Sequence, residues 1–95
     1  MTTTHAIELP TWESYGNYAS KNYGANALRF WLPNGLSIWF SYKTPVAFAT
    51  SGRFVIREND WSTTTGRHLN AIDPDKSKRV RGDEFERQLS EVLAP

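Results

Sequence analysis

The chain holds no cysteine, which excludes a cysteine nucleophile, and its two histidines are the candidates for histidine-based catalysis. His68 follows Arg67 in a stretch rich in hydroxyl side chains, Ser62 and Thr63–Thr65, where a Ser–His pair of nucleophile and base is conceivable. No G-x-S-x-G motif and no glycine-rich phosphate loop accompanies it. The alternative is an exposed or hydrogen-bonded surface histidine. We therefore expect no enzyme activity and no cofactor.

Residues 73–84 partly match a calcium-binding loop of the EF-hand type. The matching residues, at loop positions 1, 3, 5, 8 and 12, are Asp73, Asp75, Ser77, Val80 and Glu84. Lys78 stands where the sharp turn needs glycine, and four basic side chains in the loop oppose a divalent cation. The sequence therefore predicts no metal site here, only a loop between two helices.

A binding site on a sheet face is a stronger candidate. Arg29, Trp31 and Trp39 are predicted to share one face of a hairpin, and Arg53 and Arg57 are predicted to extend that face. Flat aromatic side chains beside arginine bind single-stranded nucleic acid by stacking and phosphate contact. The same combination makes strong contact points between proteins. The alternative is that an aromatic N-terminal arm covers both tryptophans and forms a second small core.

A short basic run offers a second candidate surface for phosphates or for an acidic protein. Asp73 and Asp75 at its edge weaken the positive field, and the alternative is a solvated loop. We add Arg67 and His68 to the candidate binding residues. The basic run consists of Lys76, Lys78, Arg79 and Arg81.

The elements that must position these residues begin with a hairpin over residues 27–42. A three-residue loop, Pro33–Gly35, suits a type I turn followed by a glycine in the left-handed conformation. A two-residue Asn34-Gly35 turn would mix polar and apolar side chains on both faces, so we prefer the three-residue loop. Its register makes one face wholly apolar: Leu28, Phe30, Leu32, Leu36, Ile38 and Phe40.

A second hairpin is predicted after a bend at Lys43–Pro45. Val46–Thr50 and Arg53–Arg57 flank Ser51-Gly52, which is a plausible turn. Proline cannot donate to a central ladder, so the bend should separate the two hairpins. The predicted sheet has three or four antiparallel strands.

Two helices are predicted in the last third of the chain. The first is capped by Ser62 or Thr63 and ends before Pro74, because the residue before proline avoids helical backbone angles. The second begins with a capping-box pattern, Asp83 with Glu86. Its apolar stripe at helical spacing consists of Phe85, Leu89, Val92 and Leu93.

Composition limits the class of protein. The 95 residues suffice for one domain, and 39% hydrophobic with 14% aromatic residues argue against disorder. The lack of cysteine, of a leader-like segment and of a membrane-spanning run predicts a cytoplasmic protein without membrane contact. The predicted fold class is α+β, with an irregular aromatic N-terminal arm over 1–25, antiparallel strands over 26–57 and a helix–loop–helix over 62–94.

Five strings carry a family resemblance: Tyr15–Tyr18, Asn22–Ala25, Phe40–Phe48, Glu58–Asn70 and Asp73–Val80. They resemble a small uncharacterised domain of tailed-phage and prophage proteins, and the resemblance covers about residues 15–93. It brings no known activity, so it implies no catalytic or binding residue. It does imply a phage or mobile-element origin and expression in a bacterial cytoplasm.

Small phage proteins often bind and block a host protein. We therefore expect a non-enzymatic phage accessory protein that binds a macromolecule, first of all a host protein. The alternative is a nucleic-acid-binding protein that uses the aromatic–arginine sheet face and the basic run. The net charge of +1 favours the first, because nucleic-acid-binding modules are usually more basic.

Overall fold

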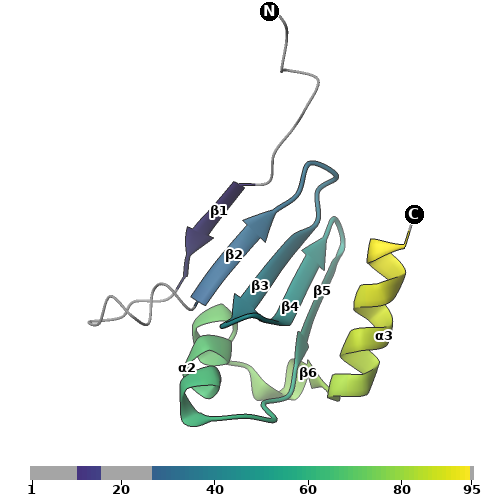
Figure 1. Cartoon of the computed structure of the whole chain (residues 1–95). Coiled ribbons are helices and arrows are strands. Elements are labelled where there is room, and N and C mark those ends of the chain that lie inside the picture. Colours follow the sequence, from purple (N-terminus) through teal and green to yellow (C-terminus); the bar gives the residue numbers. More distant parts are fainter. Residues whose placement is uncertain (1–10, 16–26, 95) are drawn as a thin grey trace, which may run out of the picture.

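The computed structural model of the chain describes residues 11–15 and 27–94 (Figure 1). Six strands form one mixed sheet in the order β1-β2-β3-β4-β5-β6, and two α-helices accompany it. This confirms the α+β class and corrects the predicted strand number. The strands are β1 (Thr11–Ser14), β2 (Ala27–Trp31), β3 (Ser37–Ser41), β4 (Thr44–Thr50), β5 (Arg53–Arg57) and β6 (Arg79–Val80). The helices are α2 (Thr63–Ile72), the 3-10 turn η2 (Lys76–Lys78) and α3 (Gly82–Leu93).

The first hairpin has the predicted register. Arg29 lies opposite Trp39 and Phe30 lies opposite Ile38, and the strands are closed by a hydrogen bond of 2.8 Å from Leu32 N to the carbonyl of Leu36. Gly35 has a φ of 89°, the left-handed conformation that the three-residue loop requires. The predicted wholly apolar face is therefore confirmed.

The second hairpin is also confirmed, but the bend before it lies elsewhere. The β3–β4 turn is formed by Tyr42, whose φ is 57°, and Lys43, and not by Lys43–Pro45. Pro45 belongs to β4, opposite Phe40, where the ladder shifts register. The β4–β5 pairing begins at Ala47, so the missing proline N–H does not interrupt that ladder.

Two short strands were not predicted. Thr11–Ser14 was assigned to the irregular arm, but it pairs antiparallel with β2 as β1. Tyr15 is also described, and it is buried after β1, whereas residues 1–10 and 16–25 of the predicted arm lie outside the described residues. Arg79–Val80 was assigned to a loop, but it pairs in parallel with Ile56 and Arg57 of β5 as β6. The sheet is therefore mixed, and the predicted helix–loop–helix contains a strand.

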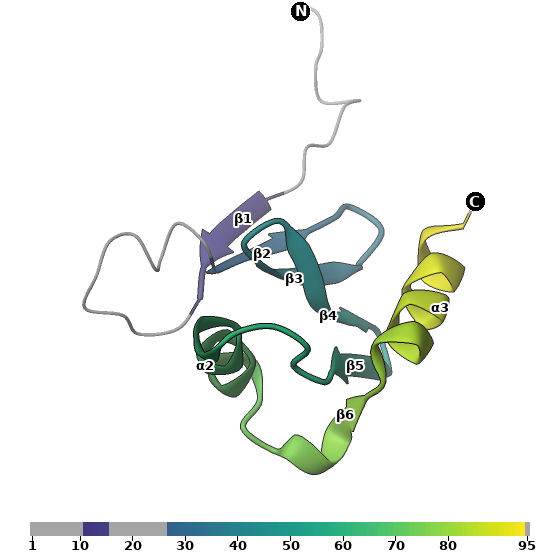
Figure 2. The same cartoon turned by 60° about the horizontal axis from the view of Figure 1, so that its bottom comes forward.

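The helices pack against opposite faces of the sheet (Figure 2). Phe48 and Val55 are paired and share one face, where the side chains of α3 cover them. Ala47 and Ile56 share the other face, where Leu69 of α2 covers them. Within the described part of the chain, neither helix has the length and apolar character needed to cross a membrane.

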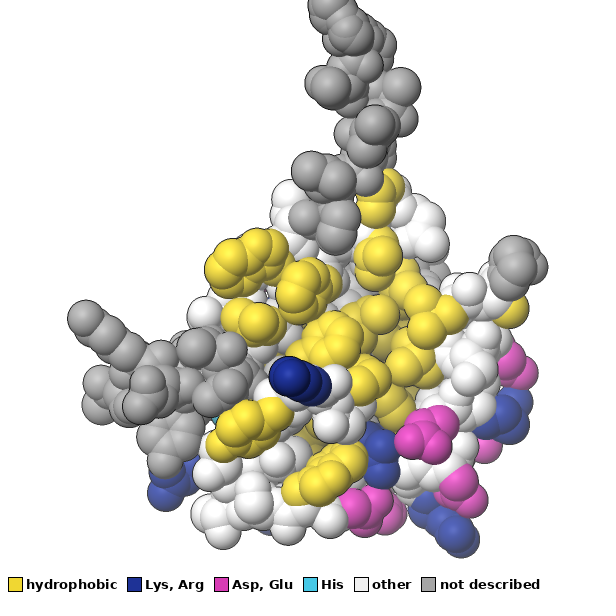
Figure 3. All heavy atoms as spheres, in the orientation of Figure 1, with side chains coloured by type: hydrophobic (Ala, Val, Ile, Leu, Met, Phe, Trp, Pro, Cys, Tyr) yellow, Lys and Arg dark blue, Asp and Glu magenta, His cyan; other side chains and the backbone are white. Residues whose placement is uncertain are grey.

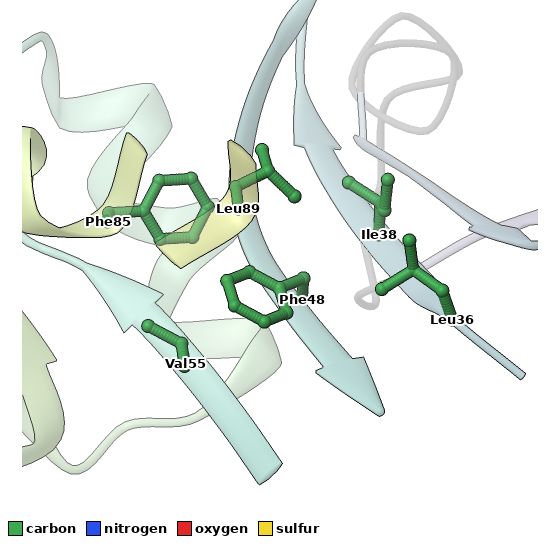
Figure 4. Packing of buried hydrophobic residues seen from close by; sticks show 6 residues of the cluster. All are labelled: Leu36, Ile38, Phe48, Val55, Phe85 and Leu89. Atoms are coloured by element: carbon green, nitrogen blue, oxygen red, sulfur yellow. The ribbon is translucent and has the colours of Figure 1, made fainter. Parts of the chain in front are cut away.

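The larger buried cluster lies between α3 and strands β3, β4 and β5. Figure 4 shows the rings of Phe85 and Phe48 next to each other. Their centroids are 5.7 Å apart, and their planes are tilted by 50°. The predicted stripe of α3 is partly confirmed, because Phe85 and Leu89 are buried whereas Leu93 is 55% exposed. The buried members of the cluster are Leu36, Ile38, Phe48, Val55, Phe85 and Leu89.

The predicted ends of α2 are confirmed, whereas the predicted start of α3 is not. Ser62 caps α2 by accepting a hydrogen bond from the Thr65 backbone N–H at 3.3 Å, and the helix ends before Pro74 as predicted. The predicted capping box of α3 is wrong. The helix already begins at Gly82, and its N-cap residue, Arg81, makes no side-chain hydrogen bond to the helix. Asp83 therefore lies inside the first turn, where its charge favours the positive end of the helix dipole.

Candidate binding surfaces and a buried histidine

The arginine–tryptophan cluster exists as predicted, on the sheet face that α2 partly covers. The guanidinium carbon of Arg29 lies 4.3 Å from the ring centroid of Trp31 and 4.3 Å from that of Trp39. The guanidinium also donates to the Ser37 hydroxyl at 3.2 Å. Phe54 packs edge-on against Trp39, with ring centroids 5.7 Å apart. Each ring of this cluster thus already has a partner, which leaves less surface for a stacked base.

Arg53 and Arg57 do not extend this cluster, so that prediction is wrong. The register places them on the α3 face, where Arg53 donates to the Gln88 side chain at 3.2 Å. Arg57 is only 6% exposed and makes an ion pair of 2.8 Å with Asp60. Its guanidinium also lies 4.4 Å from the ring centroid of Trp61. Arg57 therefore holds the segment after β5 in place and has little surface for a ligand.

Two of the four charges in the basic run are paired with carboxylates, and a third donates to an uncharged side chain. Lys78 donates to the Asp73 carboxylate at 3.0 Å, which raises the pKa of the lysine ammonium. Arg79 donates to the Asn70 side chain at 2.9 Å. Arg81 forms an ion pair of 3.4 Å with Asp83, and Lys76 is exposed. The residues do lie together as predicted, but most of their charge faces a local partner.

The carboxylates of the calcium-like loop are also occupied. Asp73 accepts from the Asp75 backbone N–H at 2.9 Å and from Lys78, and these hydrogen bonds lower the pKa of the Asp73 carboxyl. Asp75 accepts from the hydroxyl of Ser77 at 2.6 Å. Glu84, at loop position 12, accepts from Arg87 instead. Within residues 11–15 and 27–94, no three carboxylate or histidine groups come together as a metal site would need.

His68 is fully buried, which corrects the expected surface location. Its Nδ1 lies 2.6 Å from the Ser41 hydroxyl, which lies 3.1 Å from the Thr65 hydroxyl. The serine next to the histidine is therefore Ser41 of β3, and not Ser62 of the neighbouring turn. Burial lowers the pKa of His68 below its ordinary value, so the imidazole is neutral at pH 7. Arg67, the preceding candidate, is exposed on α2.

A hollow of about 310 Å³ opens beside this hydrogen-bonded network, and we name it the Ser41 pocket. Tyr42 and Trp61 form exposed walls, and Val46 is fully buried at its base. Among the described residues that line the pocket, none carries a charge. The remaining lining residues carry hydroxyl groups: Ser41, Thr44, Ser62 and Thr65.

A further candidate surface in the described part of the chain is apolar. On the α3 face, beyond the helix itself, the outward side chains of β1, β2 and β3 form what we name the outer apolar face (Figure 3). Trp12 is 62% exposed there, and the described residues that line a hollow of about 220 Å³ are all apolar. The members of the outer apolar face are Trp12, Leu28, Phe30, Leu32 and Phe40, and the buried Ile38 lies at its base. Its hollow is lined by Phe30, Leu32, Ile38 and Phe40.

Sequence reasoning missed two residues that matter for these sites. Trp12 was assigned to the arm, although Thr11 and Trp12 are both residues that favour strands and could have indicated β1. Ser41 was not connected with His68, and no spacing signal could have done so, because 27 residues separate them. Their contact depends on how α2 packs against the end of β3.

These observations define a small α+β domain whose six-stranded mixed sheet carries a helix on each face. The chain belongs to the family of unknown function DUF8033, whose model matches residues 11–87. No curated protein and no solved structure matches the chain. Membership of an uncharacterised family is therefore established.

Proposed function

We propose that this protein acts by binding another protein through the outer apolar face. The supporting observation is the surface of that face, where Trp12 is 62% exposed beside a hollow whose described lining residues are all apolar. Contiguous exposed apolar surface is typical of protein interaction sites, and aromatic side chains contribute most to such contacts. The five residues that form the face, Trp12, Leu28, Phe30, Leu32 and Phe40, carry no positive charge for the phosphates that dominate nucleic-acid binding.

The nucleic-acid alternative has a weaker basis. Its best feature is the cluster of Arg29, Trp31 and Trp39, but the guanidinium is already stacked on both indole rings. A base or phosphate would have to replace these contacts rather than add to an open surface. The basic run has the same limitation, because Lys78 and Arg79 already donate to neighbouring side chains.

We further propose that the partner is a bacterial host protein and that the protein acts in the host cytoplasm without catalysis. This finer proposal is supported by the resemblance of five sequence strings to a domain of phage and prophage proteins. The absence of cysteine is consistent with a reducing compartment. Binding and blocking a host protein is a common action of small phage proteins.

The test is a quantitative pull-down from host lysate, with and without nuclease, followed by affinity measurement with the purified captured protein. We expect capture that survives nuclease and that falls at least tenfold on Trp12→Ala. Trp61→Ala is the matched control, because it removes a tryptophan that is 48% exposed and lies outside the outer apolar face. Both variants should have wild-type circular dichroism spectra.

A parallel titration with single-stranded oligonucleotides addresses the alternative. We expect weak or no binding at physiological salt. Micromolar, sequence-tolerant binding that weakens steeply with salt and disappears when the basic run is changed to alanine would overturn the proposal. Equal loss of protein capture on Trp12→Ala and Trp61→Ala would also contradict it.

A further inference from the structure

The Ser41 pocket is lined by two segments that are distant in the sequence and that contribute matching side chains. The β3–β4 turn and the start of β4 supply an aromatic ring, that of Tyr42, and the hydroxyl of Thr44. The segment before α2 supplies the indole ring of Trp61 and the hydroxyl of Ser62. Both rings are 48% exposed. Each segment therefore brings one exposed aromatic ring and one hydroxyl to the pocket.

Trp61 is held in its exposed position by contacts to its ring and to its backbone. The guanidinium carbon of Arg57 lies 4.4 Å from the ring centroid, and Arg57 is fixed by an ion pair of 2.8 Å with Asp60. The Trp61 backbone N–H donates to the Asn59 side chain at 2.9 Å, and the Asn59 amide donates to the Ser62 carbonyl at 3.0 Å. An aromatic ring that is already ordered in this way loses little conformational freedom when a ligand packs on it.

Tyr42 is also held in place, and its backbone is strained. Its φ of 57° makes it the one non-glycine residue with positive φ in the described part of the chain, and a bulky side chain disfavours that conformation. Its ring packs on that of His68, with centroids 5.7 Å apart. Backbone strain of this kind is concentrated at functional sites, where it fixes the position of a side chain. The turn thus places a tyrosine where glycine or asparagine would be less strained.

The lining favours a neutral ligand that has both an apolar surface and hydroxyl groups. The described lining residues carry no charge that could compensate a phosphate or a carboxylate. The Ser62 hydroxyl accepts from the Thr65 backbone N–H at 3.3 Å and keeps its own proton to donate. The half-buried Thr44 hydroxyl can both donate and accept. A nucleobase is recognised by amide, carboxylate or guanidinium groups that match its edge, and the described lining has none.

We propose that the Ser41 pocket binds a neutral sugar ring. One face of a pyranose carries C–H groups that pack on an aromatic ring such as Trp61. Its rim carries hydroxyls that both donate and accept, which the hydroxyls of Thr44 and Ser62 complement. The volume of about 310 Å³ lies at the lower end of the range for small-ligand pockets and is sufficient for a monosaccharide. The pocket is separate from the outer apolar face, so sugar binding does not depend on the proposed protein binding.

The test is an NMR titration of the protein with glucose, maltose and N-acetylglucosamine at millimolar concentrations. We expect a saturable shift of the Trp61 indole N–H signal with at least one of these sugars and none with cytosine or uracil. Trp61→Ala should weaken the binding about tenfold or more, measured by saturation-transfer NMR on the sugar protons, because the stacked ring is the main contact. Trp12→Ala is the matched control, because its indole is exposed on the outer apolar face, and it should leave the sugar affinity unchanged.

A further variant covers the case in which Trp61→Ala disturbs the segment before α2. Thr44→Val removes one hydroxyl and keeps the shape of the side chain, so the circular dichroism spectrum should be unchanged while the sugar affinity falls about threefold to tenfold. Trp61→Ala should lose sugar binding and keep protein capture, and Trp12→Ala should do the reverse. No saturable shift with any of the three sugars, binding of the free bases in their place, or equal loss of sugar binding on Trp12→Ala and Trp61→Ala would each overturn the proposal.

Discussion

The two faces of the sheet differ in how far their side chains are covered by partners within the molecule. On the α2 face, several polar groups contact partners within the molecule, as Arg29 contacts two indole rings and Ser41 contacts His68, although the Arg29 Nε has no hydrogen-bond partner among the described residues. On the α3 face, the helix covers only part of the apolar surface, and Trp12 remains 62% exposed. A surface whose groups already have partners gains little from a ligand, whereas an uncovered apolar surface gains by burial. The comparison therefore favours the α3 face as the place where a partner binds.

The largest predicted effect compares one leucine on each face. Leu69 of α2 and Leu89 of α3 are both buried, and leucine-to-alanine changes in cores cost about 2–5 kcal/mol. We expect Leu69→Ala to lower the unfolding free energy by an amount near the upper end of this range, because the site of Leu69 is closed. Leu89→Ala should cost less, because Leu89 packs in the cluster that borders the open hollow. Urea denaturation of both variants measures the difference in unfolding free energy. A larger loss for Leu89→Ala would contradict this view of the two faces.

The next largest effect concerns the loop Pro33–Gly35, which sets the register of the first hairpin and therefore the face on which each side chain lies. Gly35→Ala should destabilise the protein by about 1 kcal/mol, because alanine disfavours positive φ. An added Cβ meets no atom within 4 Å, so the loss of stability would come from the backbone conformation alone. Thermal denaturation checks the value. Gly52→Ala, with a φ of 91° in the second hairpin, is the matched comparison and should lose a similar amount.

A smaller effect tests the pairing of Arg29 on the α2 face. A double-mutant cycle with Arg29→Ala and Trp39→Ala should give a coupling free energy of about 0.5–1 kcal/mol, as expected for a cation–π contact that is partly exposed. Chemical denaturation of the two single variants and the double variant provides it. Additive losses would mean that Arg29 is not held by the ring and remains available to a ligand.

The smallest effect is an expected absence. Thermal melts with calcium and with chelator should coincide, because Lys78 already occupies the Asp73 carboxylate and Glu84 is paired with Arg87. A ligand that binds only the native state would raise the melting temperature. A clearly higher melting temperature in the presence of calcium would contradict the prediction and would place a metal next to β6.

The hairpins could be predicted because their signals are local. Pro33–Gly35 demands one loop type, and alternation on both sides of it sets the register. The assignment of Arg53 and Arg57 to the tryptophan face was wrong because two turns and a register shift near Trp39 separate them from that hairpin. At a register shift, one extra residue moves every later side chain to the other face of the sheet. Such irregularities have no clear sequence pattern.

The short strands and the buried histidine depend on tertiary contacts. β6 has two residues, too few for any periodicity, and exists because Ile56 and Arg57 of β5 present an open edge. His68 and Ser41 meet only once α2 packs on the sheet. In contrast, the stripe of α3 was recognisable because Phe85 and Leu89 repeat at helical spacing.

The parallel pairing of β6 with β5 has a consequence for how the chain folds during synthesis. Strands β1 to β5 each pair with the next strand in the sequence, so their contacts are local and can form quickly. The strand that completes the sheet follows only after α2, more than twenty residues beyond Arg57. A chain leaving the ribosome therefore presents the edge of β5 unpaired for a time, and an unpaired strand edge is where aggregation begins.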